Sequence, residues 1–100
     1  MKINLDYQFL NMEGEPEQRN GKPLTMRRVC SLALGAPIEK ENIDGEEKYG
    51  RFKLIERILG AGPEIELTPE EVVKIRQLIG KVFATWYCGQ AWKMTEGKEG

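Results

Sequence analysis

The sequence contains no histidine, and this absence removes the side chain that most often carries acid–base chemistry near neutral pH. Histidine-based nucleophile pairs and histidine metal ligands are excluded with it. The two cysteines, Cys30 and Cys88, lie too far apart for the usual spacing of a zinc site. Ser31, the only serine, falls within a predicted helix without a base partner. We therefore expect a protein that is not an enzyme and that uses neither a cofactor nor a metal.

A long hydrophobic run is also lacking. The densest apolar stretch covers residues 82–88, which is much shorter than the roughly 18 residues that span a bilayer. The first residues alternate apolar and polar side chains and do not resemble the apolar region of a secretory signal. These features predict a cytoplasmic protein without a membrane partner, in which Cys30 and Cys88 remain reduced and act as small hydrophobic side chains. A disulfide between them remains the alternative.

The composition is that of an ordinary globular domain. Of 100 residues, 40% are hydrophobic and 31% are charged, and the net charge is −1. A chain of this length forms one domain with a radius of gyration of about 13 Å. We predict a single domain over residues 1–95, with a mobile loop at 11–23 and a disordered tail at 96–100. Asn20-Gly21 favours a tight turn in that loop, but its flanks lack the apolar alternation of a hairpin.

Two short segments are predicted to be strands. Residues 3–9 alternate strictly, which places Ile3, Leu5, Tyr7 and Phe9 on one buried face. Residues 64–67 alternate in the same way. We expect the two segments to pair into a small two-stranded sheet that is packed against three to four helices, which is an α+β fold.

Two helices are predicted between these strands. Thr25 is expected to cap a helix over residues 26–34, and Gly35 to end it in the left-handed conformation before Pro37. Asp44 is expected to cap the next helix, which ends at Gly60. Spacing assigns its apolar stripe to Tyr49, Phe52, Ile55, Ile58 and Leu59, and its polar side to Lys48, Arg51, Lys53 and Arg57.

The clearest helix start follows residues 64–67. Thr68 and Glu71 form a capping box around Pro69, and Leu67 and Val72 form a hydrophobic staple. This helix is predicted to end at Gly80. Residues 81–94 fit one helix, a kinked helix or a partial strand, because aromatic and β-branched side chains occupy helical spacing. We favour a break around residues 80–84, a cap at Thr85 and a last helix to about Met94.

The aromatic residues near the C-terminal end supply the leading functional hypothesis. Several large rings within ten residues need a core or an interface to cover them, and core packing is the simpler interpretation. The remaining possibility is a surface that binds a protein partner. The expected residues of this surface are Trp86, Tyr87, Trp92, Arg76 and Lys93.

A cluster of basic residues supplies the alternative. Arg27 and Arg28 on the first helix, and Arg51 and Lys53 on the second, could meet and attract phosphate groups. Acidic residues interleave with the second pair and the net charge is slightly negative, which favours an ordinary solvated surface. The alternative hypothesis is a small nucleic-acid-binding regulator.

Five short segments along the chain have a recognisable order: residues 21–25 (GKPLT), 46–48 (EEK), 66–71 (ELTPEE), 79–81 (IGK) and 89–92 (GQAW). Together they resemble a group of short proteins of tailed bacteriophages and prophages. The resemblance extends over most of residues 20–97, and no single motif in it is specific. It implies a bacterial host cytoplasm and an accessory role in host takeover, counter-defence or assembly, carried out by binding another protein or a second copy of the chain. It implies no catalytic residues.

Overall fold

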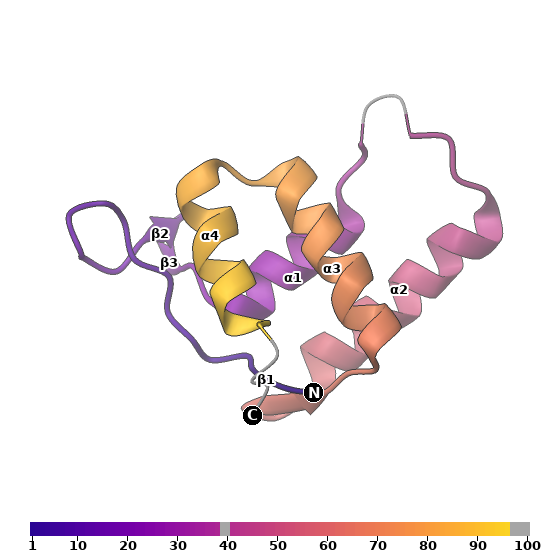
Figure 1. The fold of residues 1–100 in the computed structure, drawn as a ribbon, viewed down its shortest axis with the longest axis horizontal. Coiled ribbons are helices and arrows are strands. Elements are labelled where there is room, and N and C mark those ends of the chain that lie inside the picture. The colour runs from indigo at the N-terminus through magenta and orange to yellow at the C-terminus, as the bar shows by residue number, and fades with distance from the viewer. Residues whose placement is uncertain (39–40, 97–100) are drawn as a thin grey trace.

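The structure, a computed structural model, describes residues 1–38 and 41–96. Two small antiparallel sheets and four helices pack into an α+β fold, as predicted, with a radius of gyration of 13.3 Å. Residues 39–40 of the predicted connection, and residues 97–100 of the predicted tail, lie outside the described residues. The elements are β1 (Lys2–Asn4), β2 (Gln18–Arg19), β3 (Lys22–Pro23), α1 (Met26–Gly35), α2 (Gly45–Gly60), β4 (Glu64–Glu66), α3 (Pro69–Val82) and α4 (Thr85–Met94) (Figure 1).

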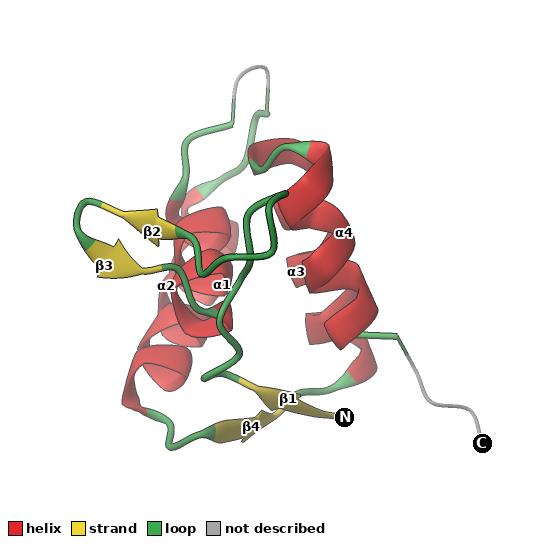
Figure 2. Ribbon diagram, turned by 90° about the vertical axis from the view of Figure 1, so that its left-hand side faces the viewer, coloured by secondary structure: helices red, strands yellow, loops and turns green. Residues whose placement is uncertain are grey.

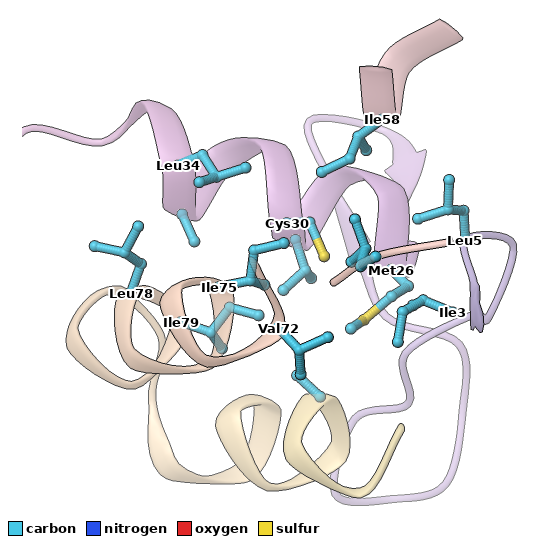
Figure 3. Close-up of a cluster of buried hydrophobic side chains, with 14 of the residues drawn as sticks. Ile3, Leu5, Met26, Cys30, Leu34, Ile58, Val72, Ile75, Leu78 and Ile79 are labelled. Carbon is cyan, nitrogen blue, oxygen red and sulfur yellow. The ribbon is translucent and has the colours of Figure 1, made fainter. Parts of the chain in front are cut away.

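Helix α1 supplies the centre of the core. It packs against both α2 and α3, and its Met26, Val29, Cys30 and Ala33 are buried. Side chains from α2, α3 and the N-terminal segment converge on it (Figure 3). The small side chains at positions 30 and 33 let neighbouring helices approach closely, so a short helix can be covered on several sides at once.

The pairing predicted for the first sheet is confirmed. Strands β1 and β4 are antiparallel, and the buried Ile3 lies opposite the buried Ile65 (Figure 2). The first strand is shorter than predicted, because after Asn4 the backbone bonds to loops rather than to a second strand: the N–H of Leu5 donates to the carbonyl of Pro63 at 2.8 Å. The alternation of residues 3–9 still fixes which side chains face inward.

The second sheet, the β2–β3 hairpin, was not predicted. Its turn residues Asn20 (φ 55°) and Gly21 (φ 76°) both have positive φ, which is the backbone of a type I′ turn. The strands do not bury an apolar face, so the alternation that usually indicates a hairpin is absent. Arg28 from α1 holds the hairpin instead: its Nη1 donates to hairpin carbonyl oxygens, the nearest being that of Pro23 at 3.0 Å.

The predicted starts of the first three helices are confirmed. The Thr25 and Asp44 side chains accept from backbone N–H groups in the first turns of α1 and α2. Thr68 and Glu71 bond reciprocally, at 3.1 and 3.0 Å, as a complete capping box. Side chains at a helix start have local partners only, and this is why the sequence specifies these starts so well.

The predicted left-handed cap at Gly35 is wrong. Gly35 is the last residue of α1, and Ala36 follows it in extended conformation with φ −74°. The physical reason is Pro37, whose ring disfavours helical backbone at the residue before it and ends the helix without a left-handed residue. Of the glycines in residues 1–96, Gly14 and Gly21 alone have positive φ.

The apolar stripe predicted for α2 is wrong in part: Ile58 is buried and Ile55 half-buried, as predicted, but the other three residues are exposed. Leu54 and Ile58 are buried together with Arg51, which was assigned to the polar side, whereas Tyr49 and Phe52 are exposed. Leu59 is exposed as well. The helix is therefore turned by roughly one residue step, about 100°, from the predicted orientation. Burial of the Arg51 guanidinium accounts for this turn, and its partners are described below.

The break before the last helix is confirmed, with two corrections. Helix α3 continues through Gly80 to Val82, and α4 starts after Phe83 and Ala84 and ends at Met94. The predicted cap at Thr85 is wrong, because Ala84 is the N-cap residue and Thr85 is already helical. Among residues 1–38 and 41–96, no helix combines the length and the apolar composition that crossing a bilayer requires.

The two cysteines are free thiols, and their different degrees of burial predict different reactivities. Burial raises the pKa of Cys30 to about 12; at about pH 8 this leaves a thiolate fraction of about one in ten thousand. Cys88 is only half-buried. We expect iodoacetamide to label Cys88 in the native protein, and Cys30 only after denaturation. Peptide mass spectrometry locates the label, and equal labelling rates in the native state would contradict the burial of Cys30.

Candidate functional site

Four of the five predicted partner-binding residues lie together on the outside of α4 and the adjoining edge of α3. Trp86 and Trp92 are 43% and 39% exposed. Gly89 lies between them on the outer side of α4, and Lys93, seven residues after Trp86, shares this side. Arg76 of α3 lies against the ring of Trp92. We call this set, with the neighbouring Leu10, the α4 surface: Leu10, Arg76, Trp86, Gly89, Trp92 and Lys93.

Trp86 is fixed in place by the N-terminal segment. Its indole Nε1 donates to the carbonyl oxygen of Leu10 at 2.8 Å. Gln90, one turn later, bonds to both backbone groups of the same residue: its Oε1 accepts from the Leu10 N–H, and its Nε2 donates to the Leu10 carbonyl, each at 2.9 Å. The Gln90 Oε1 also accepts from the hydroxyl of Tyr7 at 3.0 Å. These bonds hold residues 7–10 against α4 and hold the Trp86 ring at the surface.

Trp92 is fixed in a similar way by α3. Its Nε1 donates to the backbone carbonyl of Arg76 at 3.0 Å, and the guanidinium carbon of Arg76 lies 4.2 Å from the centre of a Trp92 ring. The cation covers part of the ring and places a positive charge beside it. Both indole N–H groups of the α4 surface are therefore already hydrogen-bonded within the chain, while a large part of each ring remains accessible.

A shallow groove runs along this surface at the corner between α3 and α4. It has a volume of about 300 Å³, and Gly89 forms part of its wall together with Phe83 and Trp92. A Cβ atom added at Gly89 would meet no atom within 4 Å, so the space above this residue is open. The absence of a side chain at position 89 leaves the Trp92 ring accessible to a protruding side chain.

Tyr87 lies apart from the other four predicted residues. It is half-buried, and the guanidinium carbon of Arg19 lies 5.5 Å from its ring centre and 5.4 Å from that of Phe83. Burial, together with the nearby carboxylate of Glu17, raises the pKa of the Tyr87 hydroxyl. These contacts join α4 to the β2–β3 hairpin, so the structure gives Tyr87 a role in packing.

The residues of the nucleic-acid alternative are not brought into one exposed basic surface. Arg27 binds the end of α2: its Nη1 donates to the carbonyl oxygens of Ile58 and Ala61 at 2.7 and 2.8 Å, and its Nη2 to that of Gly62 at 2.9 Å. Arg28 binds the hairpin, as described above. Both guanidinium groups are therefore engaged by backbone carbonyls, which a phosphate would have to displace.

Among the charged residues of 1–38 and 41–96, Arg51 is the most enclosed, at 8% exposure. Its two Nη groups donate to the two carboxylate oxygens of Glu41 at 3.0 and 2.9 Å, and its Nε donates to Glu47 at 2.9 Å. Lys74 of α3 adds a second cation on Glu47, also at 2.9 Å. These four residues, Glu41, Glu47, Arg51 and Lys74, form an ionic cluster that ties the segment before α2 to α2 and α3. Lys53, in contrast, is exposed and lies over the ring of Tyr49.

The sequence analysis missed Leu10, Gly89 and Gln90. Leu10 falls in a segment rich in charged and turn-forming residues, and its contact with α4 joins positions 80 residues apart, which local patterns do not report. Gly89 entered the predictions only as part of the segment at residues 89–92 (GQAW). The signal that could have identified it is a glycine within a helix between two tryptophans, since glycine weakens a helix and needs a packing or functional reason.

Comparisons with known protein families, with curated proteins and with solved structures find no match. Within residues 1–38 and 41–96, the cysteine and carboxylate side chains form no group of three or more that could hold a metal ion. The α4 surface therefore has to be interpreted from its own geometry.

The hydrogen bonds between Gln90 and residues 7–10, here called the Leu10 clamp, predict that two similar substitutions change stability by unequal amounts. Gln90→Leu removes four hydrogen bonds and leaves the Leu10 N–H without its partner, whereas the Leu10 carbonyl still accepts from Trp86, so we expect the free energy of unfolding to fall by about 2 kcal/mol. The control Gln77→Leu changes an exposed glutamine on α3 and should shift it by less than about 0.5 kcal/mol. Urea unfolding followed by circular dichroism measures both. Equal losses would show that the clamp contributes nothing specific.

The ionic cluster predicts how stability depends on pH. Hydrogen bonds from Arg51 lower the pKa of Glu41, and hydrogen bonds from Arg51 and Lys74 lower that of Glu47. A carboxylate whose pKa is lower in the folded than in the unfolded state stabilises the fold above its unfolded pKa, and this contribution is lost as the pH falls through the folded value.

We therefore expect Glu41→Gln to reduce the free energy of unfolding at about pH 7 and to flatten its decline between about pH 5 and pH 2. Glu64→Gln, at an exposed position of β4, is the control and should keep the decline of the unmodified protein. Urea titrations at several pH values provide the measurement. A Glu41→Gln variant with an unchanged acid decline would contradict the assigned role of this carboxylate.

Proposed function

We propose that this protein acts by binding another protein through the α4 surface, and not by catalysis. The observation that carries the proposal is the pair of half-exposed tryptophan rings, whose N–H groups are already bonded to the carbonyls of Leu10 and Arg76. Tryptophan and arginine are enriched among the residues that contribute most to protein–protein binding.

The anchoring of the rings supports this function energetically. A side chain that is ordered before binding loses little conformational entropy when a partner covers it, so more of the buried apolar area contributes to affinity. Because each indole N–H is satisfied internally, covering a ring leaves no donor without a partner. The open space at Gly89 admits a partner side chain beside the Trp92 ring.

The charges beside the rings indicate the chemistry of the partner. Arg76 places a cation over the Trp92 ring, and the exposed Lys93 adds a second cation on the same side of α4. A complementary partner presents an aliphatic or aromatic side chain flanked by Asp or Glu. Such flanking charges mainly accelerate association and exclude wrong partners, while the buried rings provide the affinity.

The resemblance to bacteriophage and prophage proteins extends the proposal to an accessory role in the cytoplasm of a bacterial host. In this role the partner is a host or phage protein, and the action is host takeover, counter-defence or assembly. The nucleic-acid alternative receives less support, because Arg27, Arg28 and Arg51 are occupied by carbonyl or carboxylate oxygens of the chain itself.

The substitution Gly89→Arg tests the α4 surface with little risk to the fold. The new side chain has open space and replaces a poor helix former, so the melting temperature should stay the same or rise slightly. The added bulk and charge would fill the groove beside the Trp92 ring. We expect at least a tenfold loss in the amount of partner that the immobilised protein retains from a bacterial lysate, measured by quantitative mass spectrometry.

Gly50→Arg is the matched control, because a Cβ at Gly50, on the distant helix α2, also meets nothing within 4 Å. It should retain the same proteins as the unmodified chain. Equal retention by both variants would refute binding through the α4 surface. If the unmodified chain retained nothing above the background of an empty matrix, the proposed bacterial partner would be refuted.

A further inference from the structure

A second apolar surface lies on the outer side of α2, away from the α4 surface. Tyr49, Phe52 and Leu59 are 60%, 51% and 59% exposed. The first two rings stack on each other, with centres 6.2 Å apart and planes 20° apart. Helix α2 lies at one side of the molecule and α4 at the other, with α1 and α3 between them (Figures 1 and 2). The two surfaces are therefore separate.

The exposed apolar residues lie along one side of the helix, with one carboxylate among them. Tyr49, Phe52, Glu56 and Leu59 follow one another at intervals of three and four residues, which is the spacing of a helix–helix contact. The opposite side of α2 is occupied by the core and by the ionic cluster of Arg51. Helix α2 thus buries one side in the fold, while more than half of each apolar side chain on the outer side remains exposed.

The charges on this side of α2 indicate what covers it. Lys53 lies toward the N-terminal part of this side and Glu56 one turn later, and both are exposed. If two copies of α2 pair in antiparallel orientation about a two-fold axis at the level of Ile55, Phe52 of each lies against Leu59 of the other. Lys53 of each then lies opposite Glu56 of the other. A parallel pair would instead oppose like charges, which is unfavourable.

We infer that a second copy of this chain covers the outer side of α2, in an antiparallel and symmetric homodimer. Helix α2 has 16 residues, so the contact is about 24 Å long. Such a contact buries less than the roughly 1,600 Å² of a standard interface. The dimer is therefore weak and dissociates on dilution. This inference does not depend on the α4 surface.

Sedimentation equilibrium over roughly 1 µM to 1 mM protein, the range of dissociation constants of weak complexes, tests the dimer. We expect a reversible increase from monomer to dimer mass. Phe52→Ser, at an exposed position that the core does not use, should raise the dissociation constant at least tenfold without changing the circular dichroism spectrum. Gly89→Arg should dimerise like the unmodified chain, which separates this result from failure of the α4 surface.

Charge exchange tests the antiparallel arrangement. Lys53→Glu and Glu56→Lys each oppose like charges in a homodimer, so each variant alone should dimerise at least tenfold more weakly. In an equimolar mixture the two variants place opposite charges together in both contacts, and the mixed dimer should regain the affinity of the unmodified chain. A monomer throughout the concentration range, a dimer insensitive to Phe52→Ser, or a mixture without recovery would each overturn the inference.

Discussion

The fold depends on the burial of α1. This short helix is the central layer of a domain of 100 residues, and a chain of that size can form only one small core. Four of its residues, Met26, Val29, Cys30 and Ala33, are almost fully enclosed by α2, α3 and segments of the N-terminal region. Several of the covering segments are neither helix nor strand, so their backbone groups need partners that regular secondary structure does not supply.

Arginine side chains supply many of these partners. Arg27 occupies carbonyls at the C-terminal end of α2, where the partial negative charge of the helix favours a cation, and Arg28 occupies carbonyls of the β2–β3 hairpin. Arg51 joins the segment before α2 to the helix through two carboxylates. Each guanidinium holds an irregular segment against a helix, and a planar group with five donors is suited to this task. Three of the four basic residues that suggested nucleic-acid binding thus have a role within the fold, and Lys53 alone of the four is exposed.

The sequence was sufficient where the determining contacts are local and insufficient where they are distant. The capping box of Thr68 and Glu71 joins residues three positions apart, and the start of α3 was predicted correctly. The hairpin at Asn20 depends on Arg28, which comes from α1. The orientation of α2 about its own axis depends on the pair of Arg51 with Glu41, which comes from the segment before the helix. On the α4 surface, tryptophan content indicated the aromatic rings, but the role of Leu10 and the separation of Tyr87 follow from contacts between distant segments.

The orientation of α2 connects the error in the sequence analysis to a functional surface. Hydrophobic periodicity assumes that the most apolar side of a helix faces the core, and on this basis it assigned Tyr49, Phe52 and Leu59 to the interior. The Glu41 and Glu47 carboxylates compensate the burial of Arg51, which allows the helix to turn its less apolar side inward. Tyr49 and Phe52 then remain on the solvent-exposed side of the helix, where more than half of each side chain adds no buried apolar area to the fold. A local rule that fails without a gain in the fold indicates a requirement beyond the fold, and for α2 that requirement is a partner surface.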